Sequence, residues 1–320
     1  MTIKVSPRIV VLTLIAIILY LLVLLTENVS AEDVPVLPEA VGLPVIEITP
    51  TGGTRDDLRR LLHVQACATG AQLRAIESEG ELARVTFDVC GVTLAGLYAP
   101  GDRGFVMVIH GTASTPAAAF GLTADDYMHG IARTLNAAGY AVFAPEILTQ
   151  PYGSADINAA RNEADRRLRP VGRSLVGNEL MALTAAMEYY GGGAVYGISL
   201  GGYLAFHTCA LSDAVTACGV SGYIEDRAGK LIGAAYPQAY WQIDNADYMV
   251  TDGYLLLFDD VEIARLIGAP LYVETGSDDP RAAYVEGVVA RMQNATSYIG
   301  TGGHETYAAA FVAWLEEMTF

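Results

Sequence analysis

The chain has 320 residues, of which 52% are hydrophobic and 17% charged, so it can bury a large core and is not generally disordered. Its 36 acidic and 19 basic residues give a net charge of −17, compatible with a saline habitat or with a genome rich in guanine and cytosine. A surface this acidic repels phosphate backbones, so nucleic acid is excluded as an expected partner.

The first 31 residues differ in composition from the rest of the chain. Lys4 and Arg8 precede an uncharged apolar run over residues 9–26, and residues 29–31 (VSA) place small side chains at a candidate cleavage site. This layout is typical of a signal peptide, but the run is also long enough to act as a membrane anchor. Either interpretation exports the chain from residue 32 onward, as a secreted, periplasmic or membrane-anchored protein outside the cytoplasm.

The cysteines and histidines limit which disulfides and metal sites are expected. An even number of cysteines in an exported protein permits disulfides, and the sequence-local pairings among the three possible are Cys67–Cys90 and Cys209–Cys218. Free, buried cysteines are the alternative. The five histidines show no metal-ligand spacing, so neither a metal nor another cofactor is expected; they stand at positions 63, 110, 129, 207 and 304.

The remaining chain is predicted to form a proline-rich linker over residues 32–53 and one domain over residues 54–320. A helix is expected over residues 55–66, followed by a hairpin around Gly91. Further strands are expected at residues 105–109, 141–144, 194–196, 215–221, 271–274 and 296–299, and further helices at residues 124–138, 174–190, 202–209, 281–292 and 305–318. This alternation indicates an α/β fold with a mostly parallel sheet covered by helices on both faces. Residues 222–268 interrupt it and are expected to form a small cap or insertion above the sheet.

Ser199 is the candidate nucleophile. Residues 197–202 (GISLGG) match G-x-S-x-G, and an apolar strand precedes the motif while a helical pattern follows it. A serine on such a tight strand-to-helix turn needs neighbours without side chains two residues away. The helix that follows points its first backbone N–H groups at a developing negative charge.

The sequence His110-Gly111-Thr112 follows the apolar strand at residues 105–109. Because this strand end is expected beside the nucleophile, the backbone N–H groups of Thr112 and Leu200 are predicted to form an oxyanion hole. An ordinary strand-to-loop turn is the alternative. His110 is also a second candidate base, although a structural role is more common at such a position.

A carboxylate and a histidine complete the candidate site. Asp279 follows the strand at residues 271–274 and is our choice for the acid that orients the base, with Asp278 as its rival. Both aspartates also suit turns or helix caps. His304 lies in a glycine loop before the last helix, where it can reach the serine as a general base, or can simply be an exposed loop residue.

The order Ser199, Asp279, His304 is the chain order of α/β-hydrolases. With the segments HGT, GISLGG, GSDDP and GGHE so arranged, residues 83–318 resemble the α/β-hydrolase superfamily. Residues 135–145 (LNAAGYAVFAP), residues 258–270 (FDDVEIARLIGAP) and GGHETY add a resemblance to exported dienelactone-hydrolase-like and acetyl-xylan-esterase-like serine esterases.

Two departures qualify what the resemblance implies. Dienelactone hydrolases use a cysteine where this chain has Ser199, and the family's frequent Pro-Asp after the fourth strand is Pro145-Glu146 here. The resemblance implies hydrolysis of a carboxylic ester through an acyl-enzyme, without cofactor, on a small-molecule or polymer-linked substrate.

Substrate contacts are expected from His110 and from the aromatic residues of the insertion, above all Tyr223 and Trp241. Those aromatic side chains suit packing between a cap and the core equally well. Two other functions stay open: a peptidase or amidase on the same fold, and a catalytically inactive, membrane-tethered binding protein. The sequence does not determine the oligomeric state.

Overall fold

The computed structural model describes residues 49–318, apart from residues 113, 125, 148–156, 226–248 and 250–252. The apolar run over residues 9–26 and most of the expected linker therefore lie outside the described residues. None of the helices in the described part of the chain is long and apolar enough to cross a membrane.

The described residues build a nine-stranded mixed sheet in the order β1-β2-β3-β5-β4-β6-β7-β8-β9. The strands β1, β2, β3 and β5 pair antiparallel, and the pairs from β5 through β9 are parallel. The strands are β1 (Ala71–Glu79), β2 (Leu82–Val89), β3 (Val92–Ala99), β4 (Phe105–Ile109), β5 (Ala141–Pro145), β6 (Gly193–Ile198), β7 (Val215–Ser221), β8 (Leu271–Gly276) and β9 (Ala295–Gly300). The expected α/β fold with a mostly parallel sheet is confirmed.

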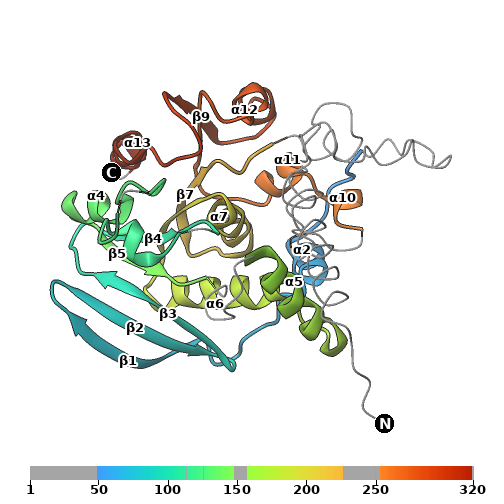
Figure 1. Ribbon diagram of the computed structural model, residues 1–320. Coiled ribbons are helices and arrows are strands. Elements are labelled where there is room, and N and C mark those ends of the chain that lie inside the picture. Colours follow the sequence, from blue (N-terminus) through green and yellow to red (C-terminus); the bar gives the residue numbers. More distant parts are fainter. Residues whose placement is uncertain are drawn as a thin grey trace, which may run out of the picture. The chain divides into compact units, whose positions relative to one another are not determined.

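Helices cover both faces of the sheet and bury two separate apolar clusters (Figure 1). One face carries α2 (Arg55–Leu61), α6 (Leu175–Tyr189), α7 (Leu200–Leu211), α10 (Tyr254–Leu257), α11 (Asp260–Ala264) and α12 (Ala282–Val289). The other carries α3 (Pro116–Ala119), α4 (Ile131–Ala137) and α13 (Ala308–Met318). Helix α5 (Ile157–Leu168), which leads into the short 3₁₀ helix η1 (Arg169–Val171), packs against α6. Strand β4 is buried along its whole length, as its continuous apolar sequence predicts.

The parallel strands place the predicted motifs at one edge of the sheet. Carboxyl ends of parallel strands lie on the same side, and ligands of open α/β sheets bind there. His110 follows β4, Ser199 follows β6, and Asp279 and His304 come after β8 and β9. The topology therefore brings together residues that are as many as 194 positions apart, from His110 to His304.

Several helices are shorter than the sequence pattern predicts. Helix α4 begins only at Ile131, because His129 (φ 46°) and Gly130 (φ 62°) adopt left-handed backbone conformations that a helix cannot continue through. Helix α2 ends at Leu61 and α13 begins at Ala308. The expectation of a helix over residues 124–138 is therefore wrong in its first half, which forms turns instead.

Sequence patterns also missed some elements. Strand β1 lies at the edge of the sheet and exposes Leu73 and Ile76, and none of residues 71–78 is buried, so the strand lacks the buried apolar face of a half-buried strand. Helix α5 has low hydrophobicity and buries the polar residues Arg161 and Asp165. Its pattern lacks the apolar face that predicts an amphipathic helix.

The described part of the insertion packs against a face of the sheet. Residues 253–268 contain α10 and α11, and the side chains of Phe258 and Val261 belong to the same core cluster as α7. The Tyr254 hydroxyl lies 2.8 Å from Nε2 of the buried His207 on α7. This segment is therefore a core element and not a cap above the strand ends, while residues 226–248 lie outside the described residues.

The four cysteines form the two sequence-local disulfides. Cys67 is bonded to Cys90, and Cys209 to Cys218, with Cα atoms 5.8 and 6.2 Å apart. The first bond ties the start of β1 to the β2–β3 hairpin, and the second links the end of α7 to β7. The predicted pairing is confirmed.

Candidate active site

Ser199 sits on a strained turn between β6 and α7. Its backbone angles (φ 58°, ψ −121°) lie in a region that non-glycine residues rarely adopt, and its N–H donates to the carbonyl of Ser221 at 2.9 Å. A Cβ at Gly197 would overlap the carbonyl oxygen of Gly201, and one at Gly201 would overlap that of Ile109. Both glycines of the motif are therefore required by close backbone approach.

The predicted oxyanion-hole residues flank this turn. Leu200 is the first residue of α7, so its N–H stands at the positive end of a helix dipole. Gly111 packs against Ser199, because a Cβ on Gly111 would lie 3.1 Å from the Ser199 Cβ. Thr112 follows directly, and neither its N–H nor that of Leu200 donates to an acceptor among the described residues. Two backbone donors therefore stand beside the serine.

The histidine and one aspartate meet in direct contact. His304 Nδ1 lies 2.7 Å from Asp279 Oδ2, and the Asp279 side chain is fully buried. Asp278 is exposed, and its carboxylate accepts a hydrogen bond from the neighbouring Ser277 hydroxyl. Of the two candidate aspartates, Asp279 is therefore the one in contact with His304.

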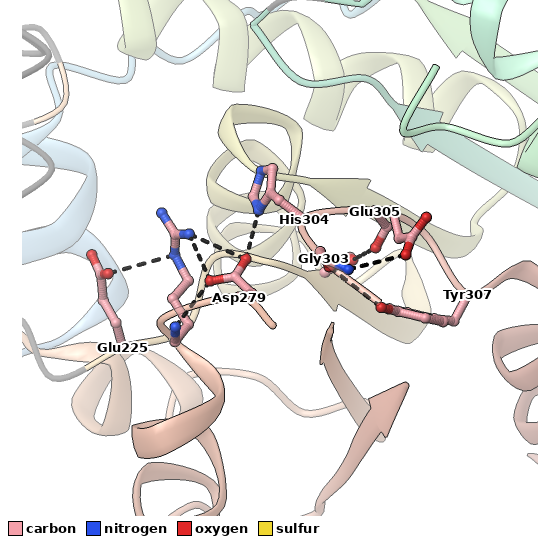
Figure 2. A network of polar contacts seen from close by, with 8 residues as sticks. Glu225, Asp279, Gly303, His304, Glu305 and Tyr307 are labelled. Carbon is pink, nitrogen blue, oxygen red and sulfur yellow. Dashed lines mark hydrogen bonds and ion pairs between the residues drawn. The ribbon is translucent and has the colours of Figure 1, made fainter. Parts of the chain in front are cut away.

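Arg281 holds the same carboxylate from the other side. Its Nη1 lies 3.1 and 3.3 Å from the two Asp279 oxygens, and its backbone N–H donates to Oδ1 at 2.9 Å. Asp279 thus contacts both Arg281 and His304, and Glu225 Oε2 lies 3.6 Å from Arg281 Nε. Figure 2 shows Asp279, His304 and Glu225 in this network. Burial alone would raise the Asp279 pKa, but the hydrogen bond from His304 and the charge of Arg281 lower it to about 2. Asp279 is therefore ionised wherever the protein is folded near neutral pH.

The loop that carries His304 is braced by its own neighbours. Glu305 Oε1 accepts from the Gly303 N–H at 3.1 Å, and the Tyr307 hydroxyl donates to the Gly303 carbonyl at 3.3 Å (Figure 2). On its other side the imidazole packs against Gly222, where a Cβ would lie 2.6 Å from Cε1. Gly222 follows Ser221, which accepts the Ser199 N–H, so one corner of β7 contacts both the serine turn and the histidine.

His110 is buried, and both of its ring nitrogens contact the backbone. It is 2% exposed, its Nδ1 lies 2.8 Å from the Gly111 carbonyl oxygen, and its Nε2 accepts from the Ile147 N–H at 3.4 Å. Burial lowers the His110 pKa to about 4, so the ring is neutral. Both nitrogens are engaged with the backbone, so His110 supports the loop at Gly111 and does not make the open substrate contact that was expected.

Of the other two residues that were expected to contact substrate, the structure describes only Tyr223. Tyr223 is 6% exposed and packs against Tyr203, Phe206 and His207, so it belongs to the core and does not line an open site. Trp241 lies outside the described residues.

Glu274 is a buried acid that sequence reasoning passed over. It lies on β8, accepts a hydrogen bond from the Tyr196 hydroxyl, and accepts from the Tyr307 N–H at 3.0 Å. Burial raises the Glu274 pKa, and the hydrogen bonds from Tyr196 and Tyr307 only partly oppose it. Glu274 thus joins the strand that leads to Ser199 with the loop that follows His304. Its position within a predicted apolar strand was the one available signal.

No cluster of three His, Cys, Asp or Glu side chains that could hold a metal ion occurs among the residues that the structure describes. The carboxylate of Asp279 is engaged with His304 and Arg281, and that of Glu274 with the Tyr196 hydroxyl and the Tyr307 N–H. The described residues thus bring a histidine and a buried carboxylate into contact, and they place Ser199 on a strained turn.

Replacing Asp279 by Asn should lower kcat by about 10⁴-fold, because an amide does not stabilise the imidazolium or hold its tautomer. The substitution should also make the free energy of unfolding less dependent on pH below about 3.8. A carboxylate with a lowered pKa stabilises the fold above its ordinary value of 3.8, and this contribution is lost as the pH falls from 3.8 to about 2. Urea unfolding between pH 2 and 5 measures the effect, with Asp278→Asn as the matched control. An equal loss of activity in both variants would contradict the assignment.

Replacing Glu274 by Gln should make stability less dependent on pH above 4.5. A buried acid with a raised pKa favours the fold in its protonated form, and that advantage declines as the pH rises above the unfolded value of 4.5. Glutamine keeps an oxygen for Tyr196 and Tyr307 without acquiring charge. Urea midpoints at pH 5, 7 and 9 test this, with the exposed Glu188→Gln as control. A variant that parallels the wild type at all three values would refute the role.

Comparison with known proteins identifies the architecture. No protein-family model and no curated protein sequence matches the chain. Among solved structures, a proposed acetyl xylan esterase from Bacteroides fragilis NCTC 9343 is similar, with a TM-score of 0.60 at 12% identity over 82% of this chain and 86% of that one. Acetyl xylan esterase 1 from Thermoanaerobacterium sp. JW/SL YS485 has a TM-score of 0.54 at 16% identity, over 85% and 95%.

A cold-adapted esterase from an Arctic intertidal metagenomic library has a TM-score of 0.51 at 14% identity, over 78% of this chain and 100% of that one. Identities this low establish the fold alone. Together with the strand order and the placement of the three loops, they confirm the predicted resemblance at that level: the chain has the α/β-hydrolase fold.

Proposed function

We propose that this protein is a serine hydrolase that cleaves carboxylic esters through an acyl-enzyme. The observation that carries the proposal is the 2.7 Å contact between His304 and the ionised Asp279, beside a serine on a strained, glycine-flanked turn. Strain of this kind costs about 1–3 kcal/mol and is commonly retained where it serves chemistry. The esterases that share the fold support ester hydrolysis over other reactions of the fold.

The proposed reaction has two steps. His304 Nε2 takes the proton of the Ser199 hydroxyl as its oxygen attacks the ester carbonyl, and Asp279 stabilises the resulting imidazolium. The N–H groups of Thr112 and Leu200 bind the tetrahedral oxyanion. Its collapse breaks the C–O bond, and the imidazolium gives its proton to the departing alcohol. Water then attacks the acyl-enzyme in the same way, releasing the acid and restoring Ser199.

A fluorophosphonate probe tests the nucleophile directly. The wild type should be labelled stoichiometrically, and Ser199→Ala should not be labelled and should lose about 10⁶-fold in kcat. The acyl-enzyme should appear as a burst of alcohol equal to the enzyme concentration with an activated acetyl ester. If the wild type stays unlabelled, the inactive binding protein becomes the better explanation.

A substrate panel separates esterase from amidase and narrows the ester. Short acyl esters, longer acyl esters, acetylated xylan oligosaccharides and matched anilides should be compared at equal enzyme, with Ser199→Ala as background. We expect ester turnover to exceed anilide turnover by several orders of magnitude, because an amine is the poorer leaving group. Comparable rates on esters and anilides would favour a peptidase or amidase.

We further propose that the protein is exported. Two disulfides support this proposal, since such bonds persist in oxidising compartments. The N-terminal segment, with cationic residues before an apolar run, supports it independently. N-terminal sequencing of protein from fractionated cells should find residue 32 first, or the intact segment in the membrane fraction. Intact protein in the cytoplasmic fraction would refute export.

A further inference from the structure

Tyr127 is held between the two loops that carry the catalytic machinery. It belongs to the turn over residues 126–130, which precedes α4. The Thr306 N–H, two residues beyond His304, donates to the Tyr127 carbonyl at 2.9 Å. On the other side, Ser114 of the oxyanion loop donates its hydroxyl to Asp126 at 2.6 Å. The turn that carries Tyr127 is thus bonded to both loops, through the Tyr127 carbonyl and the Asp126 side chain.

The Tyr127 hydroxyl lies beside the nucleophile. A Cβ on Gly111 would meet Tyr127 Oη at 2.6 Å and Ser199 Cβ at 3.1 Å, so the hydroxyl and the serine crowd the same peptide. The phenol ring also lies 6.1 Å from the His304 imidazole, between centroids. Its oxygen is buried from solvent. Tyr127 therefore reaches all three parts of the site: the serine, the base and the oxyanion loop.

The same crowding explains why position 111 is a glycine. Its φ lies outside the left-handed region, so its backbone conformation does not demand glycine. What a side chain there would meet is the Tyr127 oxygen and the Ser199 Cβ. Gly111 thus leaves room for a hydroxyl beside Ser199, directly before the predicted donor Thr112.

Thr112, on the loop that follows β4, carries a second hydroxyl close to this place. Thr112 Oγ1 is buried and has no hydrogen-bond partner among the described residues. A buried hydroxyl without a partner costs about 1–3 kcal/mol, which a bound polar atom would relieve.

We propose that the Tyr127 hydroxyl donates a hydrogen bond to the oxyanion of the tetrahedral intermediate, as a third donor beside the N–H groups of Thr112 and Leu200. This inference rests on the proposed ester hydrolysis. A tyrosine hydroxyl has one proton to donate, and a ring on a turn that is bonded to two loops keeps that proton in place as charge develops. No proton is transferred in this role, so Tyr127 acts equally in the formation and the hydrolysis of the acyl-enzyme.

The test is Tyr127→Phe, which keeps the ring and removes only the hydroxyl. We expect kcat to fall by about 10²–10³-fold with little change in KM, as for other oxyanion donors. The loss should be the same for acetyl esters of good and poor leaving groups. Tyr140→Phe is the matched control, because its buried hydroxyl lies just before β5, at the opposite end of the strands. That variant should stay within twofold of the wild type.

A pair of inhibitors makes the test independent of how much variant is folded. A trifluoromethyl ketone adds to Ser199 and forms an oxyanion, whereas the matching methyl ketone largely stays trigonal. The ratio of the two inhibition constants should drop in Tyr127→Phe by about the factor lost in kcat, and should not change in Tyr140→Phe.

The outcomes separate this inference from the function on which it rests. An active, fluorophosphonate-labelled wild type with an unchanged Tyr127→Phe variant would overturn the role of Tyr127 and leave the esterase intact. A loss that grows with poorer leaving groups would also overturn it, since the hydroxyl would then serve the departing alcohol. An unlabelled, inactive wild type would defeat both proposals together.

Discussion

The backbone conformation of Ser199 is the constraint on which the rest of the site depends. An L-residue at φ 58° and ψ −121° is strained, and here it is held by the bond from its N–H to Ser221 and by the immediate start of α7. Gly197 and Gly201 allow this, because a side chain on either would collide with neighbouring backbone. This conformation leaves the N–H of Leu200 at the start of α7. The loop at Gly111 packs against the same turn, and His304 packs against Gly222, the residue after Ser221.

Two buried acids, Glu274 and Asp279, lie close together in the chain but have different surroundings, and these surroundings shift their pKa values in opposite directions. Asp279 is buried, yet His304 and Arg281 keep its pKa near 2, so it remains a carboxylate. Glu274, five residues earlier, has tyrosine hydroxyl and backbone partners but no cation in contact among the described residues, and burial raises its pKa. The first contacts a histidine and an arginine, whereas the second links β6 to the residues after His304. Strand β8 and the turn after it thus carry two acids whose pKa values shift in opposite directions.

The loops of the site are joined to each other as well as to the sheet. His110 fixes the oxyanion loop through the backbone at Gly111 and Ile147. The turn over residues 126–130 bonds to the oxyanion loop through Asp126 and to the histidine loop through Thr306. A further contact of 2.5 Å joins His129 to Glu305, next to His304. The turn over residues 126–130 is therefore bonded both to the loop after β4 and to the loop after β9.

The sequence by itself determined the parallel core strands, the disulfide pairing and the strand-to-helix turn at Ser199, because each of these follows from local patterns: apolar runs, neighbouring cysteines and glycine spacing. It did not separate Asp278 from Asp279, which differ only in the direction their side chains take from one turn. It assigned His110 and Tyr223 to substrate, because burial of a polar or aromatic side chain depends on residues far along the chain. The helix predicted over residues 124–138 was too long at its start, because the spacing of apolar residues does not reveal the left-handed backbone at His129. Arg281, Glu274 and Tyr127 entered the site only through tertiary structure, which alone brings residues from separate strand ends within hydrogen-bonding distance.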